Sequence, residues 1–90
     1  KEINIVLKAD VKGSEEAVKN SLVKISVEGV KINIIRSSIG AISPSDIVLA
    51  AASDAIIIGF NIRPDNKTAD YAKERNVDIR LYMLRIFIYV

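Results

Sequence analysis

Residues Ile5–Val18 have the sequence IVLKADVKGSEEAV: an apolar run, a turn with one glycine, and the start of a segment that favours a helix. The apolar run belongs to Ile3–Ala9, whose β-branched residues predict a strand. Ser14 can cap the helix that follows, which we expect to extend to about residue 26. One face of this helix is expected to be buried, and it carries Ala17, Val18, Leu22 and Ile25. The stretch therefore predicts a strand followed by a helix that packs on it.

The second strand and helix follow in the same order. Val30–Ser38 (VKINIIRSS) alternates and then becomes apolar, which predicts a strand. Ser43 and Pro44 suit the N-cap and the first position of a helix, and Asp46 can complete a capping box. This helix, Pro44–Ser53, is apolar on nearly every side, so we expect it to be well buried.

Two further strands complete the pattern. Ala55–Asn61 (AIIIGFN) is continuously apolar, as is typical of a central strand covered on both faces. A polar helix is predicted for Asp65–Arg75, with Ala69 and Ala72 on its inner side, and Val77–Met83 (VDIRLYM) predicts the fourth strand.

The alternation of strands and helices with short connections defines the fold class as α/β. It demands parallel strands joined by right-handed crossovers, and it predicts a three-layer α/β/α sandwich with a four-stranded parallel sheet and three crossover helices. A doubly wound order of 2134 places helices on both faces and the first and third strands in the middle. Residues 1–90 are expected to form a single domain. Because the first residue is Lys rather than Met, we expect the chain to be a piece of a longer protein.

The composition excludes several kinds of function. The net charge of +2 comes from 13 basic and 11 acidic residues, a balance that does not by itself indicate nucleic-acid binding. Cysteine and histidine are both absent, which removes thiolate metal sites and most nucleophile–base pairs. We therefore expect no metal site and no catalytic residues. We also expect no membrane span, because the apolar runs are far shorter than about 18–20 residues. The lack of cysteine is compatible with a reducing cytosol, and we expect a cytoplasmic location. We also expect a monomer.

The loop in the opening stretch resembles the outline of a phosphate-binding loop. A P-loop requires G-x-x-x-x-G-K-S/T and a dinucleotide fingerprint requires G-x-G-x-x-G, and neither is present. Glu15 and Glu16 are predicted in the first helical turn, where their carboxylates would repel a phosphate. We therefore expect no nucleotide or other cofactor in this loop. Asp10 and Gly13 are expected to shape the turn, while Ser14 caps the helix.

One candidate binding site follows from the topology. In an open parallel sheet, ligands bind at the carboxyl edge of the strands, where the loops converge. That edge is expected to bring together Lys12, Arg36 with its neighbouring serines, and Arg63 with Asn61. The three cations are candidate contacts for the phosphates of RNA. The alternative is a solvated rim whose basic residues meet by chance. The carboxylates are expected to be solvated singly rather than paired for catalysis, and Phe60 is expected in the core.

The sequence also resembles a known family. The third domain (the first of the C-terminal pair) of bacterial translation initiation factor two typically contains LKADVxGSxEAL, SDxxLAxAS, AxIIGFNVRPD and VDIRxY in this order. The matching segments lie at Leu7–Val18, Ser45–Ser53, Ile57–Asp65 and Val77–Tyr82. The resemblance covers roughly residues 3 to 83, and it implies the same parallel sheet of order 2134.

The resemblance also implies a function. In the full-length factor a GTPase domain and a β-barrel precede this unit, and a long helix connects it to a second barrel that holds the formylmethionyl end of initiator tRNA. The factor promotes initiator tRNA binding to the small ribosomal subunit and subunit joining. The implied role is a non-catalytic structural relay, with GTP bound by another domain. The implied partners are small-subunit ribosomal RNA and neighbouring domains, and the contact with initiator tRNA is only indirect.

The end of the chain departs from the family pattern. The family continues with an amphipathic acidic helix, whereas residues 84–90 (LRIFIYV) contain no acid, and their β-branched and aromatic residues favour a strand. Two alternatives to the relay role remain open at this point. One is a free-standing α/β domain that binds or converts a small ligand at the carboxyl edge. The other is an RNA-binding module in its own right.

Overall fold

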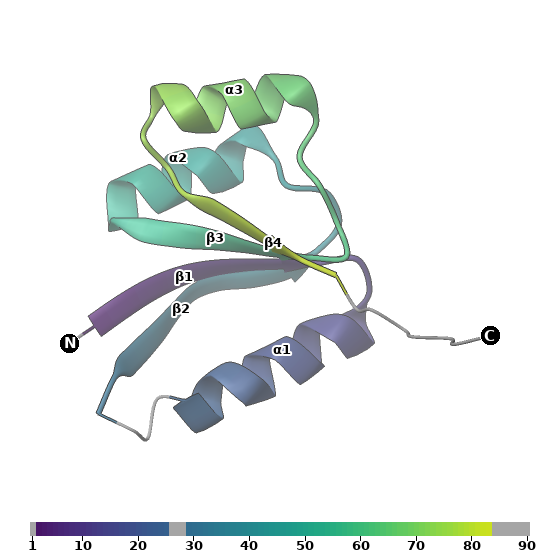
Figure 1. Cartoon of the computed structure of the whole chain (residues 1–90), viewed down its shortest axis with the longest axis vertical. Helices are drawn as coiled ribbons and strands as arrows, with labels where there is room; N and C mark the ends of the chain where they lie inside the picture. Colours follow the sequence, from purple (N-terminus) through teal and green to yellow (C-terminus); the bar gives the residue numbers. More distant parts are fainter. Residues whose placement is uncertain (1, 26–28, 84–90) are drawn as a thin grey trace.

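The predicted alternation of strands and helices is present in the computed structural model, which describes residues 2–25 and 29–83 (Figure 1). In chain order the elements are β1 (Glu2–Ala9), α1 (Lys12–Ile25), β2 (Lys31–Ile39), α2 (Pro44–Ser53), β3 (Ala55–Phe60), α3 (Asn66–Glu74) and β4 (Ile79–Tyr82).

The four strands form one parallel sheet. Its order is β2-β1-β3-β4, which confirms the predicted order 2134 with β1 and β3 in the middle. Figure 1 shows α1 on one side of the sheet and both α2 and α3 on the other side. The three-layer α/β/α sandwich is therefore confirmed.

The larger part of the core lies between the sheet and the α2–α3 layer. Val6 of β1 and Ile57 of β3 have no exposed surface, and Ile47 of α2 is equally buried. They pack together with Ala50 of α2 and Ala72 of α3. Because successive side chains of a strand point to opposite faces, this places Val6 and its second neighbour Lys8 toward α2.

A smaller part of the core lies under α1. Ile5 and Leu7 of β1 and Ile58 of β3 are buried on this face. Val18 and Leu22 of α1 pack against them and are half-buried. The predicted inner face of this helix is only partly correct, because Ala17 is exposed.

The start of α1 differs from the sequence prediction. The helix begins at Lys12, and the Val11 carbonyl accepts a hydrogen bond from the Glu15 N–H at 3.1 Å, so Ser14 lies inside the first turn and is not the N-cap. Gly13 is helical and lacks a positive φ, so it does not shape the turn. The connection is this short because the Asp10 N–H bonds to the Phe60 carbonyl at 3.3 Å, which holds the chain against β3.

The prediction for α2 is right at its start and wrong about its burial. Ser43 is the N-cap, Pro44 occupies the first turn, and Asp46 completes the capping box. Val48 is 46% exposed and Ala51 is exposed as well. Because α2 lies in an outer layer, only its stripe toward the sheet and α3 is buried.

Smaller differences occur near the end of the chain. Phe60 is half-buried rather than a core residue. β4 begins at Ile79, because the Val77 N–H still bonds to the Ala72 carbonyl of α3 at 2.9 Å. The Ile25 side chain, the expected helix end at residue 26 and the strand expected for residues 84–90 lie outside the described residues. Among the described residues, no helix is long and apolar enough to cross a membrane.

Candidate functional site at the carboxyl edge of the sheet

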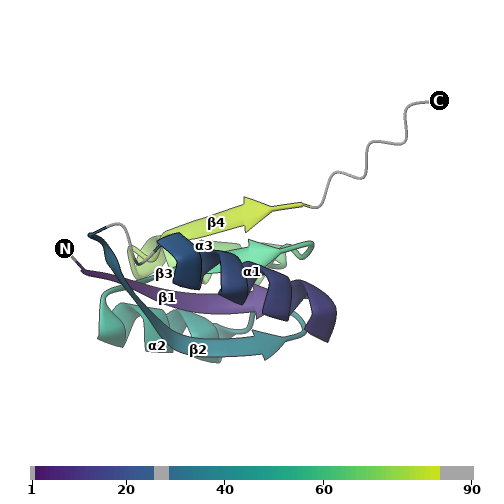
Figure 2. The same ribbon diagram turned by 90° about the horizontal axis from the view of Figure 1, so that it is seen from below.

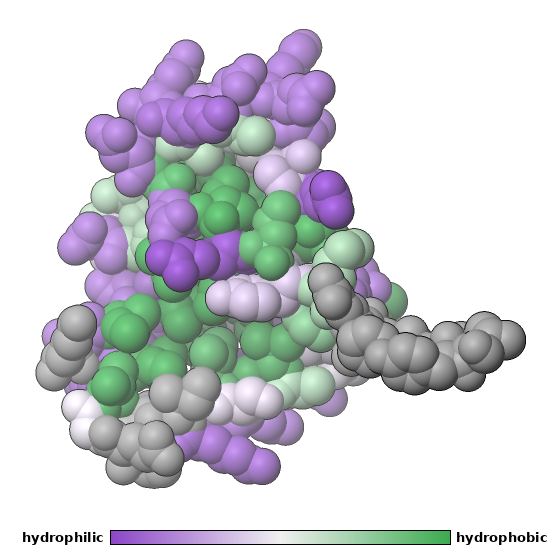
Figure 3. Space-filling view, viewed as in Figure 1, coloured by the Kyte–Doolittle hydropathy of each residue, from purple (hydrophilic) through white to green (hydrophobic). Residues whose placement is uncertain are grey.

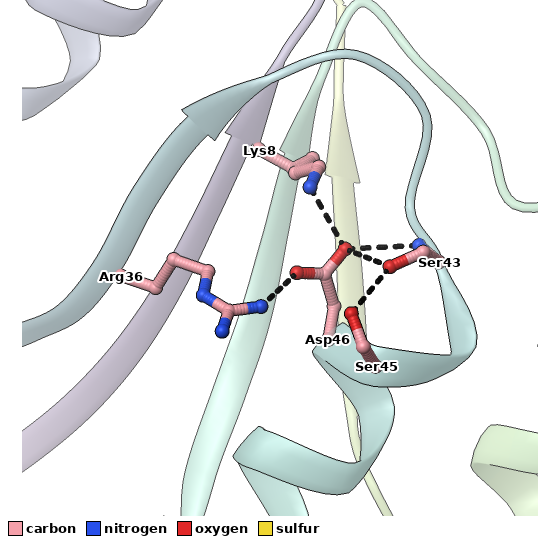
Figure 4. Close-up of polar contacts among 5 residues, drawn as sticks. All are labelled: Lys8, Arg36, Ser43, Ser45 and Asp46. Atoms are coloured by element: carbon pink, nitrogen blue, oxygen red, sulfur yellow. Dashed lines mark hydrogen bonds and ion pairs between the residues drawn. The ribbon is translucent and has the colours of Figure 1, made fainter.

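A buried charged cluster lies beneath the carboxyl edge of the sheet (Figure 4). Lys8 Nζ is 3.0 Å from Asp46 Oδ2, and the exposed fractions of the two side chains are 11% and 0%. Arg36 Nη1 is 3.2 Å from Asp46 Oδ1. The Ser43 N–H and hydroxyl both donate to Oδ2, at 2.9 and 3.0 Å. We call these residues, together with Ser45, whose hydroxyl is 3.0 Å from that of Ser43, the Asp46 cluster.

The backbone explains why these groups meet. Lys8 lies two residues after Val6 and shares its face of β1, toward α2. Arg36 reaches the same face because of a register shift: Ile5 pairs with Ile34, but Val6 pairs with Arg36. One extra residue, Ile35, therefore lies in β2 at this point, and without it Arg36 would point toward α1. The start of α2 supplies Ser43 and Asp46, so one carboxylate joins β1, β2 and α2.

The environment keeps Asp46 ionised. Burial would by itself raise the pKa of this carboxyl group, but hydrogen bonds from the Ser43 N–H, from Lys8 and from the Ser43 hydroxyl, together with the charge of Lys8, lower it below the ordinary value of 3.8. The carboxylate is thus an internal anion at the N-terminus of α2, where the helix dipole also favours negative charge. The carboxylate is fully paired within the cluster, which connects β1, β2 and α2 at this edge.

The three cations predicted for RNA contact lie in different environments. Lys12 is the first residue of α1, its side chain is 76% exposed, and its Nζ is 4.0 Å from Glu16 Oε1. Arg63 is exposed in the loop between β3 and α3. Arg36 is 42% exposed and belongs to the Asp46 cluster, on the α2 face of the sheet. The side chains of Lys12 and Arg63 are thus exposed to solvent at the rim, whereas the Arg36 guanidinium is paired with Asp46 on the α2 side of the sheet.

The serines next to Arg36, which are Ser37 and Ser38, and Asn61 next to the rim also lie in different environments. Ser37 donates to the Glu15 carboxylate, so this acid is buried against β2 rather than directed at the loop. Ser38 Oγ is buried and has no hydrogen-bond partner among the described residues. Asn61 has a φ of 59°, the left-handed region, where the chain turns out of β3.

Sequence reasoning missed Lys8. The signal was present, because a lone lysine inside the apolar run IVLKA requires a buried partner if the strand is central. Asp46 was assigned only as a helix cap, and nothing local in the sequence connects it with a residue 38 positions earlier in β1. The register shift that turns Arg36 toward it has no evident sequence signal.

These observations define a class of protein. The chain is a doubly wound α/β domain whose carboxyl edge combines a cluster of two cations around one buried carboxylate with exposed cations. Among residues 2–25 and 29–83, no three His, Cys, Asp or Glu side chains gather in a way that could hold a metal ion.

Comparison with known proteins identifies the family. Residues 1–89 match the family model for translation-initiation factor 2. The chain therefore belongs to the translation initiation factor 2 family, and it is a domain of an initiation factor that acts in protein biosynthesis.

Individual relatives agree with this assignment. Translation initiation factor IF-2 of Halalkalibacterium halodurans is 62% identical over 82 residues, which are 91% of this chain and 11% of that protein. The corresponding factor of Shouchella clausii is 60% identical over 82 residues, again 91% and 11%. That of Carboxydothermus hydrogenoformans is 55% identical over 84 residues, 93% of this chain and 10% of the relative. The chain thus spans about a tenth of the length of these curated relatives.

Proposed function

We propose that this chain is the third domain, the first of the C-terminal pair, of a bacterial-type initiation factor, and that it works there as a non-catalytic relay. In this role residues 1–90 form one domain between a GTPase part and the C-terminal barrel that holds initiator tRNA. The observation that carries the proposal is the match of residues 1–89 to the family, in relatives roughly ten times as long. The domain contacts neighbouring domains of the same cytoplasmic, monomeric factor, and it contacts initiator tRNA only indirectly.

Small-subunit ribosomal RNA is the proposed partner of the exposed rim. Lys12 and Arg63 carry charge at the carboxyl edge, and such side chains bind phosphates without reading sequence. Arg36 takes a lesser part, because its guanidinium already pairs with Asp46.

No nucleotide is bound in this domain under the proposal. The first turn of α1 carries the buried Glu15, whose carboxylate accepts a hydrogen bond from Ser37. Calorimetric titration of the chain with GTP, GDP and NAD should give no heat of binding up to millimolar ligand. Micromolar binding of any of the three would favour the alternative of a small-ligand domain.

The ribosome contact can be tested with charge-matched variants of the full-length factor. Lys12→Ala with Arg63→Ala removes two cations from the rim, and Lys19→Ala with Lys24→Ala removes two exposed cations from later in α1. The rim variant should bind small subunits more weakly, and the slope of log K against log salt concentration should fall by about 1 for each phosphate that it no longer binds. If both variants behave alike, the rim is not the contact surface.

A further inference from the structure

The extra residue in β2 leaves two buried carboxylates unequally paired. On the α2 face of the sheet, Asp46 forms ion pairs with both Lys8 and Arg36. On the α1 face, Glu15 is only 9% exposed and accepts a hydrogen bond from Ser37. No cation among the described residues pairs with Glu15. Because a buried charge is stable only with a partner, the cations are distributed unfavourably in this register of β2.

Two other side chains near the extra residue are also poorly accommodated. Ile35, which is the extra residue itself, is 41% exposed although it lies in a strand. The Ser38 hydroxyl is buried and lacks a hydrogen-bond partner in the described part of the chain. Figure 2 shows β2 bending along its length at the edge of the sheet, as a strand with an extra residue does. All these features depend on where the extra residue lies in β2.

We propose that the extra residue can move along β2, so that this strand has two registers. In the observed register Val6 pairs with Arg36, and in the second register Val6 pairs with Ile35. A shift of one residue turns every side chain of the shifted part to the opposite face of the sheet. The pairing before Ile35 is unchanged, so only the half of β2 near the carboxyl edge moves.

The second register brings Arg36 to the other buried carboxylate. In the observed register Ser37 pairs with Leu7 and faces α1, where its hydroxyl bonds to Glu15. After the shift Arg36 pairs with Leu7 instead, so its guanidinium lies on the face that carries Glu15. The long arginine side chain can reach a carboxylate that the short serine side chain contacts in the observed register. An ion pair between Arg36 and Glu15 follows.

The remaining positions also improve after the shift. Asp46 keeps Lys8 as its partner, so each of the two buried carboxylates has one cation. Ile35 lies beside Val6 and faces the apolar core under α2. The Ser38 hydroxyl leaves the position in which it has no partner. The second register therefore resolves the three unfavourable features of the observed one.

The shift costs little elsewhere in the sheet. The Arg36 side chain is 42% exposed, and ion pairs with this exposure contribute little to stability. The Gly40 N–H bonds to the Ala9 carbonyl at 2.8 Å, and the Ile39 N–H takes its place in the second register. Ile39 then leaves the strand, where it is already 52% exposed. Gly40 has a φ of 109°, and glycine can adapt to the longer connection without strain.

The proposed shift changes the carboxyl edge in two ways. The connection between β2 and α2 consists of residues 40–43 in the observed register and of residues 39–43 in the second. The positive charge of Arg36 moves from the α2 face to the α1 face. A partner that binds one form of the edge more tightly would therefore shift the population of the two registers. The inference concerns the domain itself and does not depend on the proposed ribosomal role.

The opposite edge of the sheet provides an internal reference. β3 and β4 pair without a register shift, and neither strand contains a carboxylate. Hydrophobic side chains gather across the middle of the face on which β4 lies (Figures 1 and 3). We therefore expect a single register for β4, and its signals can be compared with those of β2.

A disulfide trap tests the second register in the full chain. The chain has no cysteine, so Glu15→Cys with Arg36→Cys introduces the only two thiols. In the observed register these positions lie on opposite faces of the sheet, where two cysteines cannot form a bridge. In the second register they share a face, so a disulfide should form in the folded protein under a glutathione redox buffer.

Deletion of Ile35 gives the matched control. Without the extra residue, the observed pairing of Val6 with Arg36 is the regular one, and no residue remains that could move. In the deletion chain the pair Glu15→Cys with Arg36→Cys should therefore stay reduced. The pair Glu15→Cys with Ser37→Cys should bridge in both chains, which shows that the deletion chain folds with the observed pairing.

Saturation-transfer NMR of the chain without cysteines gives an independent measurement. The amides of Leu7, Arg36 and Ser37 should exchange with a minor state on the millisecond timescale, whereas those of β4 should not. Glu15→Gln removes the carboxylate that attracts Arg36 to the α1 face, so it should lower the minor population several-fold. Deletion of Ile35 should abolish the exchange.

Two results would overturn the proposal. The first is a disulfide between positions 15 and 36 that fails to form, or that forms equally fast in the chain without Ile35. The second is exchange in β2 that is absent, or that persists unchanged after deletion of Ile35. Either result would mean that β2 has only the observed register.

Discussion

Asp46 carries a negative charge on a side chain with no exposed surface, and Lys8, Arg36 and Ser43 surround it with polar contacts. Such a group stabilises a fold only while its partners remain in place, since a buried charge without a partner is costly. Three elements depend on this one carboxylate, so we expect it to be the most sensitive polar position in the described part of the chain.

Asp46→Ala should therefore destabilise the protein strongly. The change leaves the Lys8 ammonium, 11% exposed, without its partner, and breaking a buried pair in this way costs about 3–5 kcal/mol. Urea denaturation of the chain at pH 7 measures the loss. A decrease below about 1 kcal/mol, the range of exposed ion pairs, would contradict the burial seen in the structure.

Two matched variants separate the charge from the packing. Arg36→Ala should cost well under the Asp46 change, because the arginine is 42% exposed and water can replace its contact. Lys8→Met combined with Asp46→Leu removes both buried charges together, and it should recover much of the stability that Asp46→Ala removes.

The same carboxyl group predicts a pH dependence. Its pKa is lowered in the folded protein, so its stabilising contribution is fully present above the unfolded value of 3.8 and is lost as the pH falls through the lower folded value. The stability difference between the native chain and Asp46→Asn should thus be constant from about pH 7 to about pH 5 and shrink at lower pH. A difference that stays constant down to about pH 2 would show that the charge of Asp46 is not its cause.

At the level of the elements, Gly13 and Gly59 differ in the space that surrounds them. A Cβ at Gly13, in the first turn of α1, would meet no atom within 4 Å. A Cβ at Gly59 in β3 would lie 2.9 Å from a methyl carbon of Leu81 and 3.1 Å from one of Ile42. Glycine is thus needed in the strand for close packing, whereas helix α1 does not need it for space.

Alanine substitution should reveal this difference. Gly13→Ala should stabilise the protein by roughly 0.4–1 kcal/mol, because alanine loses less conformational entropy in a helix. Gly59→Ala should destabilise it by about 1–3 kcal/mol through overpacking. Thermal denaturation of both variants provides the measurement. A destabilised Gly13→Ala chain would indicate that Gly13 has a role outside the described contacts.

The elements themselves were largely predictable from local patterns. The capping box at Ser43 and the apolar run of β3 placed two of them correctly, since both signals are local. The start of α1 was misplaced because the hydrogen bond from Asp10 to Phe60, which shortens the connection, is a tertiary contact. Burial of α2 was overestimated because apolar composition alone does not indicate which layer a helix occupies.

For the whole molecule, the alternation of strands and helices predicted the parallel sheet, and the apolar run of β3 and the family resemblance favoured its order 2134. The candidate site was predicted only in part. The rim positions of Lys12 and Arg63 could be inferred from topology, because loops after parallel strands meet at one edge. The ion pair between Arg36 and Asp46 could not be inferred from topology, because it depends on one extra residue in β2 and on a partner in α2. Ion pairs between residues far apart in the sequence, such as Lys8 with Asp46, could not be predicted from local sequence patterns.

The relay role is the central claim, and one measurement in the full-length factor tests it most directly. Asp46→Asn loosens the joint between β1, β2 and α2 without touching the proposed GTP or tRNA sites. The ratio of initiator tRNA bound to small subunits with GTP to that bound with GDP should fall toward one. The affinities of the factor for GTP and for free initiator tRNA should be unchanged. The claim is that this domain couples the nucleotide state of the GTPase part to the binding of initiator tRNA. A ratio equal to that of the native factor, in a variant whose domain is measurably less stable, would contradict that claim.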